Sequence, residues 1–353
     1  MLVTQTDTAS AADLDQARQL AGQIMSGWQT QALYVAAHLK LADRLADGPM
    51  ETATLAKLTG SDAGSLLRLL RALCTLGICQ ETMDGCFTLT ASGQLLSTKP
   101  SDGAVSLRPL ALWWGGPLWP MWGELLYSVQ TGQSARRKLT GKNGYEHLED
   151  TSEAAVFHHA MQSLTAIISQ EIAQCGTWAH AHSVVDVGGG NGHLALAIVG
   201  KHPHLHAIVL DQESARAAAD ALIESKGLAS RCRFECGNFF EPWPAGADRY
   251  LLKSILHNWS DADCDRILAH CRQAMPERGR ILLVERVRPD RFQENVHDQA
   301  LARTDLNMLA GLGGCERSQA EFTAMLDTAG LKISNTYKTS FEFTLIEARI
   351  SSI

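Results

Sequence analysis

The N-terminal part of the chain has apolar residues at helical spacing. Between residues 13 and 45 they recur every three or four positions, which predicts helices with one buried face. Gly22 and Gly27 interrupt this pattern. Because glycine weakens a helix interior, we expect the helix to break there.

Residues 51–99 contain a series of short elements. Two helices and then two strands joined by an Asp84-Gly85 turn are expected, at 54–58, 63–76, 78–81 and 86–89. This order is typical of a winged-helix module, which serves either DNA binding or packing and dimerisation. The segment carries four basic and four acidic residues, a balance that disfavours a groove-reading helix. We therefore favour a role in packing or dimerisation.

Residues 101–170 are expected to be helical and are rich in aromatic side chains. Four of the eight tryptophans lie close together, at Trp113, Trp114, Trp119 and Trp122. Such a group fits a buried interface, where tryptophan is common, and it equally fits the wall of a flat apolar pocket. Both interpretations stay open.

From Val184 onward, short β-rich segments alternate with helical ones. The helices are expected at 194–201, 214–226, 261–275 and 318–329. This alternation predicts an α/β fold with a parallel, doubly wound sheet. The last two strand-like segments have no helix between them, so we expect the sheet to end in antiparallel strands.

The length and composition agree with two domains. The chain has 353 residues, 45% of them hydrophobic, which is more than one compact core needs. We expect a first domain over residues 1–100 and a second over 101–353. Within the second, 101–170 is interpreted as a helical linker that lines a substrate pocket, and 171–353 as a Rossmann-like core.

Charge and cysteine usage exclude several function classes. A net charge of −7 argues against binding to nucleic acid or to an anionic membrane surface. The sequence contains no signal-peptide pattern and no membrane-length apolar run, so we expect a cytoplasmic enzyme. The nine cysteines form no CxxC pair and no zinc-type spacing, which predicts neither a disulfide nor a metal. Cys232 and Cys236 share one face of an expected strand and are predicted to be buried.

A glycine-rich loop, residues 188–192, follows the first strand of the expected sheet. Nucleotide cofactors bind at this edge, and glycine lets a ligand approach the backbone closely. His193 stands where a dinucleotide fingerprint needs its third glycine, and the Gly-Lys-Ser/Thr ending of a P-loop is missing. Asp186, Gly188 and Gly190 are therefore candidate contacts for S-adenosylmethionine, whose cationic end suits the acid before the loop.

Two polar residues follow later strands at the same edge. Asp211 ends the second strand, where a carboxylate can bind both hydroxyls of a ribose, although this would serve NAD as well as S-adenosylmethionine. His257, one of thirteen histidines, follows the fourth strand and could face a bound methyl group as a base. A capping or interface role for His257 is the alternative.

An ordered set of motifs resembles one enzyme family. The segments DVGGGNG, CGNFFEPWP, LLKSILHNWSD, ILLVE and LNMLAGLGGCERSQAEF are similar, in this order, to those of the plant-type small-molecule O-methyltransferases and their bacterial natural-product branch. The resemblance covers essentially the whole chain. It implies a winged-helix dimerisation domain, a homodimer, and S-adenosylmethionine as methyl donor with S-adenosylhomocysteine as product.

The resemblance also implies further cofactor contacts. Gly237, Asn238 and Phe239 stand where the family cradles the adenine, although the family usually has aspartate in place of Asn238. The carbonyl oxygen of the Asn238 amide can still meet the adenine amino group. Lys253 and Trp259 match a lysine and an aromatic residue beside the cofactor.

Three residues match the catalytic group of the family. His257 corresponds to its general base, and Glu285 and Glu316 correspond to the carboxylates that orient the histidine. The resemblance implies in-line transfer of the methyl group to an acceptor oxygen without a metal. A regulator with a winged helix, and a family member that uses the cofactor for hydroxylation or decarboxylation, are the alternatives. The lack of excess basic residues argues against a winged-helix regulator. The retained histidine and the two acids argue against a use of the cofactor other than methyl transfer.

The acceptor is expected to be a small hydroxylated aromatic natural product of phenazine, quinone or polyketide type. Phe157 and Met161 match the residues with which the family lines its substrate site, and their spacing puts both on one helical face. Ordinary core packing explains the same spacing. Asn307 and Met308 are further candidates for this pocket. The sequence does not distinguish among the acceptor types.

Overall fold

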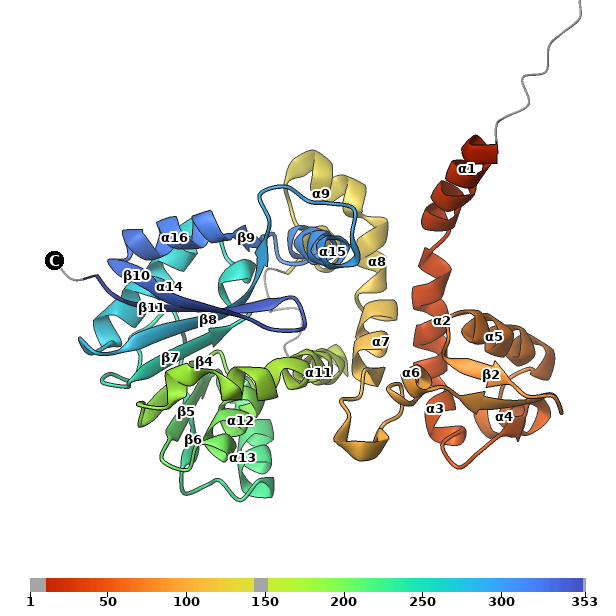
Figure 1. Cartoon of the computed structure of the whole chain (residues 1–353), viewed down its shortest axis with the longest axis horizontal. Helices are drawn as coiled ribbons and strands as arrows, with labels where there is room; N and C mark the ends of the chain where they lie inside the picture. Colours follow the sequence, from red (N-terminus) through yellow and green to blue (C-terminus); the bar gives the residue numbers. More distant parts are fainter. Residues whose placement is uncertain (1–10, 143–151, 352–353) are drawn as a thin grey trace, which may run out of the picture. The chain divides into compact units, whose positions relative to one another are not determined.

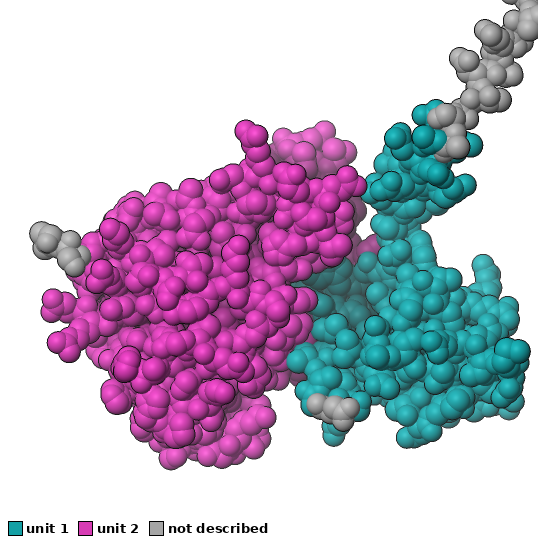
Figure 2. All heavy atoms as spheres, in the orientation of Figure 1, with its two compact units in different colours: residues 1–118 teal, residues 119–353 magenta. Residues whose placement is uncertain are grey.

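The computed structural model describes residues 11–142 and 152–351. The chain divides into two compact units, residues 1–118 and 119–353, which Figure 2 shows in different colours. Among the helices of the described residues, none is long and apolar enough to cross a membrane.

The first unit contains the expected helices and hairpin. Its helices are α1 (Ala11–Ile24), α2 (Gly27–His38), α3 (Leu41–Arg44), α4 (Thr52–Thr59), α5 (Ala63–Thr75), α6 (Ala91–Gln94) and α7 (Arg108–Gly115). The strands β1 (Met50–Glu51), β3 (Cys86–Leu89) and β2 (Cys79–Glu81) form an antiparallel sheet in this order. The expected break is confirmed at Gly27, since α1 ends at Ile24 and α2 begins at Gly27, whereas Gly22 lies inside α1.

Helix α7 packs against α2 and so belongs to the first unit. The two helices approach so closely that a Cβ at Gly115 would lie 2.3 Å from Cβ of Tyr34. The Gln31 side chain also donates a hydrogen bond to the Gly115 carbonyl, at 2.9 Å. The division between the units therefore falls after Leu118, later than the boundary expected at residue 100.

The second unit is built on a mixed sheet (Figure 1). Five strands run parallel: β6 (Cys232–Cys236), β5 (His206–Asp211), β4 (Ser183–Val187), β7 (Arg249–Lys253) and β8 (Arg280–Arg288). Beyond β8 the sheet continues with the antiparallel strands β11 (Phe343–Ile350) and β10 (Leu331–Lys338), and the short β9 (Arg317–Ser318) pairs parallel with β8. The predicted doubly wound sheet with an antiparallel ending is confirmed.

Helices cover both faces of this sheet. One apolar core joins it to α11 (Ser152–Gln174), α12 (His193–Lys201) and α13 (Arg216–Ser225), and a second joins it to α14 (Asp261–Ala274) and α16 (Gln319–Thr328). The remaining helices are α8 (Trp119–Gly123), α9 (Leu125–Thr131), α10 (Ala135–Thr140) and α15 (Val296–Gly311). Short 3₁₀ turns lie at Ser101–Gly103, Gly176–Trp178, Glu213–Ala215 and Leu256–Asn258.

The prediction that Cys232 and Cys236 are both buried is wrong for Cys236. Cys232 is buried in the core, whereas Cys236 is exposed. β6 is the outermost parallel strand, and Cys236 is its last residue, so the strand has left the cover of α13 at that point. Alternation along a strand predicts a shared face, but not how far the covering helix extends.

Candidate active site

The carboxyl ends of the parallel strands bring most of the candidate residues to one edge of the sheet. Asp186 lies in β4 just before the glycine loop, and Asp211 ends β5. Lys253 ends β7, and Glu285 lies near the end of β8. Because β4 is central and parallel to its neighbours, the side chains that follow these strands converge there.

The glycine loop requires glycine at the two positions singled out. Gly188 and Gly190 have φ of +69° and +57°, a region that favours glycine. A Cβ at Gly188 would also lie 2.5 Å from Cδ1 of Ile255. The N–H of Gly190 donates to Oδ2 of Asp211 at 2.7 Å, and the N–H of Gln212 donates to Oδ1 at the same distance. Each carboxylate oxygen of Asp211 keeps a further lone pair for a ligand.

The carboxyl group of Asp186 lies beneath the loop rather than beside it. The residue is 2% exposed, and a Cβ at Gly189 would lie 2.8 Å from its Cγ. Burial raises the pKa of Asp186 to about 7. Its Oδ2 has no hydrogen-bond partner among the described residues. A buried carboxylate oxygen of this kind favours a bound donor or cation nearby.

Aromatic rings gather beside the glycine loop. The rings of Phe239 and Trp259 are 5.7 Å apart, and Phe240 packs edge-on against Trp259 at 4.8 Å. Gly237 before them is tightly packed, since a Cβ there would lie 2.6 Å from Cδ1 of Leu210 and this side chain would have to shift. The side-chain oxygen of Asn238 accepts a hydrogen bond from the N–H of Phe240, at 3.0 Å. This bond fixes the turn and leaves one lone pair on that oxygen.

Lys253 ends β7, and the charges of both Asp186 and Glu285 act on its side chain. Burial, together with the charge of Arg286, lowers the pKa of Lys253 to about 8, against the opposing effects of Glu285 and Asp186. Its Nζ lies 5.2 Å from the ring centroid of Phe343. The ammonium group of Lys253 is therefore held within the electrostatic field of Asp186 and Glu285 rather than at the surface.

His257 is carried by a tight turn at the end of β7. Ser254 adopts φ of +55°, an uncommon conformation for a residue other than glycine, and reverses the chain there. The side-chain amide of Asn258 donates to the Ser254 carbonyl at 2.9 Å and closes the turn. His257, 6% exposed, is thereby directed toward the acidic residues.

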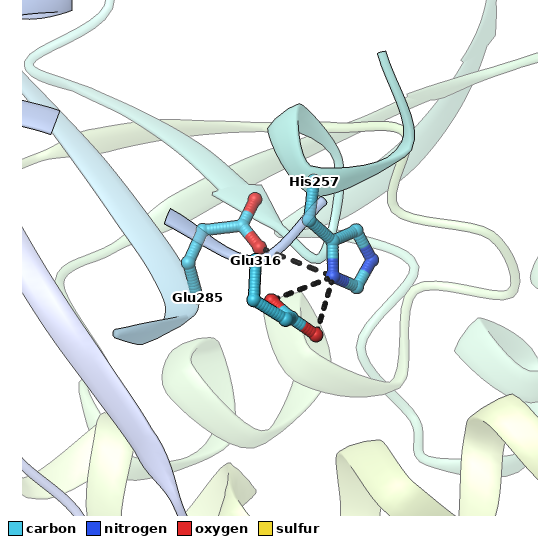
Figure 3. Close-up of side chains that lie close together, drawn as sticks. All are labelled: His257, Glu285 and Glu316. Atoms are coloured by element: carbon cyan, nitrogen blue, oxygen red, sulfur yellow. Dashed lines mark hydrogen bonds and ion pairs between the residues drawn. The ribbon is translucent and has the colours of Figure 1, made fainter. Parts of the chain in front are cut away.

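Two buried glutamates face one nitrogen of the imidazole (Figure 3). Nδ1 of His257 lies 3.3 Å from both carboxylate oxygens of Glu316 and 3.8 Å from Oε2 of Glu285. The other oxygen of Glu285 accepts hydrogen bonds from the N–H groups of Ile255 and Leu256, each at 2.9 Å. Glu285 therefore contacts both the backbone of the turn and the ring. The second ring nitrogen points away from both acids.

The charges in this group favour a protonated imidazole. Burial lowers the pKa of His257, but the charges of Glu316 and Glu285 and the hydrogen bond with Glu316 outweigh it, so the pKa is raised. Burial raises the pKa of Glu285. Burial also acts to raise the pKa of Glu316, but the charge of His257, the hydrogen bond with His257 and the charge of Arg286 together outweigh burial, so this pKa is lowered. The histidine is thus a stronger base than an exposed one.

His257, Glu285 and Glu316 also have a spacing that could hold a metal. One ligand atom from each lies within 4.8 Å of the others, and no second group of this kind occurs within residues 11–142 and 152–351. Glu285 already accepts two backbone hydrogen bonds through Oε1. Both glutamates reach the histidine through Nδ1, which is the arrangement of an oriented base.

The candidate acceptor residues lie on two helices beside this edge. Phe157 and Met161, both partly exposed, lie on α11, and the charges of His158 on the same helix and Asp211 affect each other's pKa. Asn307 and Met308 lie on α15, and Oδ1 of Asn307 is buried without a hydrogen-bond partner among the described residues. The four residues thus come from two helices of the second unit.

The tryptophan-rich segment is shared between the two units. Trp113 is buried in the first unit, and Trp114 is partly exposed there. Trp119 and Trp122, both partly exposed, belong to α8 of the second unit. Each unit therefore carries two of these four tryptophans.

Sequence reasoning missed two residues that hold the acidic group in place. Oδ1 of Asp305 accepts a hydrogen bond from the N–H of Glu316 at 2.8 Å. A Cβ at Gly314 would lie 2.0 Å from the carbonyl oxygen of His257, so only glycine permits this approach. The paired glycines before Glu316 were the available signal for a close backbone contact, whereas nothing marked Asp305 in the sequence.

Comparison with known proteins agrees with this arrangement. A family model described as an O-methyltransferase domain matches residues 122–332, and one described as an O-methyltransferase dimerisation domain matches residues 23–99. The chain belongs to the O-methyltransferase family. The resemblance seen in the sequence motifs is thereby confirmed.

Individual members of the family match over nearly the whole chain. Phenazine O-methyltransferase PhzM of Lysobacter antibioticus is 35% identical over 93% of this chain and 94% of its own. Mitomycin biosynthesis 6-O-methyltransferase of Streptomyces lavendulae is 33% identical over 90% of this chain and 90% of its own. The structure of the O-methyltransferase NcsB1 from neocarzinostatin biosynthesis, solved with S-adenosylmethionine and 2-hydroxy-5-methyl naphthoic acid, matches with a TM-score of 0.76 and 33% identity, over 91% of this chain and 96% of NcsB1.

Proposed function

We propose that this O-methyltransferase methylates a hydroxyl oxygen of a small aromatic natural product, with S-adenosylmethionine as donor and His257 as general base. The observation that carries the proposal is the contact of Nδ1 of His257 with both oxygens of Glu316, at 3.3 Å, at the same sheet edge as the glycine loop. S-adenosylmethionine is bound in the NcsB1 structure, and two relatives act on a phenazine and in mitomycin biosynthesis.

The cofactor would be held at the glycine loop and the aromatic rings next to it. Asp211 offers its free lone pairs to the ribose, and Phe239 and Trp259 offer apolar faces to the adenine. Gly188 and Gly190 let the ligand approach the backbone, while buried Asp186 favours positive charge above it. These residues fit the group, and Asn238, Gly237 and Lys253 complete the proposed set. When bound, S-adenosylmethionine supplies an electrophilic methyl group to the acceptor oxygen.

The proposed proton transfer runs through His257. A phenol has a pKa near ~10 and an imidazole near ~6.5, so the transfer in water is uphill. The two carboxylates raise the pKa of His257 and narrow this difference. With Nδ1–H donating to Glu316, the second ring nitrogen carries the lone pair that takes the acceptor proton. Glu285 and Glu316 keep the ring in this orientation and stabilise its charged form.

The acceptor class is inferred from the lining residues and the relatives. Phe157, Met161 and Met308 are proposed to provide an apolar surface, and the unpartnered oxygen of Asn307 a polar contact. Such a lining suits a flat aromatic ring that carries a hydroxyl group, as in phenazines, quinones and aromatic polyketides. The ligand named for NcsB1 is likewise a hydroxylated naphthoic acid.

An acceptor screen tests this proposal. We expect hydroxylated phenazines, naphthoates or quinones to release S-adenosylhomocysteine, because each presents a hydroxyl group on a flat apolar ring. Each compound is compared with its deoxy analogue, which lacks the oxygen nucleophile and is expected to be inactive. Equal release from the deoxy compounds, or conversion of an acceptor without S-adenosylhomocysteine, would refute transfer to oxygen.

The reaction is expected to need no divalent metal. If His257, Glu285 and Glu316 act as a base and its orienting acids, a metal bound at Nδ1 would leave the ring proton on the second nitrogen, which then has no lone pair to take the acceptor proton. Turnover is therefore expected to change less than about twofold after treatment with EDTA and dialysis, since no step depends on metal-ion catalysis. Loss of turnover that is restored by Zn²⁺ or Mg²⁺ would contradict this.

The protein is proposed to be a homodimer. Residues 23–99 match a dimerisation domain, and the described part of α1 and the start of α2 expose the apolar side chains of Leu20, Ile24 and Trp28. Such a surface favours burial against a partner. Size-exclusion chromatography with light scattering is expected to give twice the chain mass of 38.3 kDa. A stable species of the single-chain mass at micromolar concentration would contradict the proposal.

A further inference from the structure

The turn that carries His257 is held by a buried arginine from another segment. The side chain of Arg317, with 3% of its surface exposed, reaches the turn from β9. Its Nη1 donates to the carbonyl of Leu256 at 2.8 Å, and its Nη2 donates to the carbonyl of Trp259 at 2.9 Å. These carbonyls lie on either side of His257, so the guanidinium spans the turn.

The same guanidinium also contacts the start of α14. Nη2 and Nε of Arg317 lie 2.7 and 3.1 Å from Oδ1 of Asp261. The carboxylate of Asp261 is 83% exposed and screened by water, whereas the two carbonyl contacts are shielded. The planar fork of donors matches this set of acceptors, which a lysine could not do.

Arg317 follows Glu316 directly in the chain, so its hydrogen bonds to the His257 turn also connect this turn to the segment that carries Glu316. The N–H of Cys315 donates to the carbonyl of His257 at 3.0 Å, and Gly314 packs against the same carbonyl. The segment 314–317 thus contacts the backbone of His257 and also carries Glu316, whose carboxylate contacts the imidazole ring. The distance from Nδ1 to Glu316 depends on how firmly the two segments are joined.

We propose that Arg317 is a positioning residue for the general base: it joins the His257 turn to the segment that carries Glu316 and so keeps the imidazole against its carboxylate. This role rests on the function proposed for His257. Glu316, Glu285 and Arg286 are the charged groups that face the imidazole, and Arg317 contacts none of the reacting atoms. Its effect on turnover is transmitted through the turn.

The test compares Arg317→Met with Arg317→Lys, and uses Arg272→Met, an exposed position on α14, as the matched control. For Arg317→Met we expect kcat to fall about 10- to 100-fold, because small displacements of a catalytic group have effects of this size. The Kd for S-adenosylmethionine is expected to stay within about twofold, since the glycine loop is untouched. Arg317→Lys should fall in between, because lysine keeps the charge but lacks the fork.

A readout independent of activity separates positioning from general stability. NMR titration of His257, assigned by the signal lost in His257→Ala, should give a lower imidazole pKa in Arg317→Met and Arg317→Lys, since the ring moves away from Glu316. Asp261→Asn should leave both kcat and this pKa near wild type, because the carbonyl contacts remain. If Arg317→Met does not fold, Arg317→Lys decides by the same readout.

An unchanged imidazole pKa in a folded Arg317 variant would overturn the proposal, even if kcat fell. A wild-type kcat together with a lowered pKa would also overturn it, because the displacement would then have no catalytic effect. The proposed base itself is tested separately, since active His257→Ala would refute that function while the NMR titration still reports whether Arg317 positions the ring.

Discussion

The His257→Ala variant is expected to lose about 10²- to 10⁴-fold in kcat, the usual contribution of a general base. The acceptor hydroxyl would then lose its proton to water, with no oriented imidazole nearby. Binding of S-adenosylmethionine should change little, because His257 lies on the turn after β7 and not in the glycine loop. Single-turnover rates and calorimetric Kd values measure the two effects separately.

The matched control for this variant is His297→Ala. His297 is an exposed histidine on α15 and is expected to leave kcat unchanged. Turnover of His257→Ala within about threefold of wild type would show that the base is another group, since a general base contributes far more. Loss of cofactor binding would instead show that the turn supports the glycine loop.

The Glu316→Gln variant is expected to change the pH dependence as well as the rate. The base acts in its neutral form, so turnover rises with pH through the pKa of His257. In the wild type that pKa is raised, and the half-maximal pH should lie above the ordinary imidazole value of about 6.5. Removing the Glu316 charge lowers the pKa of His257, so the acidic limb should move down by about one pH unit.

The lowered pKa of His257 in the Glu316→Gln variant also determines how kcat differs from that of the wild type at each pH. On the alkaline plateau the weaker base should lower kcat about tenfold, and below the wild-type midpoint the deficit should shrink, because more of the variant is in the neutral form. Glutamine keeps the size of the side chain and an acceptor oxygen, so the ring stays oriented. The exposed Glu277→Gln is the control. An acidic limb that stays in place, or moves upward, contradicts the coupling of His257 to Glu316.

Much of the fold could be predicted from local patterns. Four of the helices that cover the sheet, α12, α13, α14 and α16, begin and end within two residues of their expected bounds, because periodicity and capping are local properties. Ser260 caps α14, and its Oγ accepts a hydrogen bond from the N–H of Asp263. The extent of the first unit depends instead on the contact between Tyr34 and Gly115. These two residues lie far apart in sequence, so no local pattern predicts that they meet.

Some residues of the candidate site could likewise be predicted from local patterns, whereas others depend on long-range packing. Residues that follow strands, such as Asp211 and His257, could be placed at one edge because the ends of parallel strands converge. The position of Asp186 under the loop, with its raised pKa, follows from packing around Gly189 that alternation does not specify. The roles suggested by geometry for Asp305 and Arg317 arise from contacts between segments distant in sequence. They become visible only when the turn and the Glu316 segment are seen together.

Methyl transfer to oxygen is tested most directly with S-adenosylmethionine that carries a ¹³C-labelled methyl group. The wild-type protein is incubated with this donor and an acceptor found in the screen, and the product is examined by NMR. We expect the label in a methoxy carbon of the acceptor, with an equal amount of S-adenosylhomocysteine, and only background labelling with His257→Ala. Label on nitrogen or carbon, or turnover of the acceptor while the labelled donor remains intact, would contradict the account.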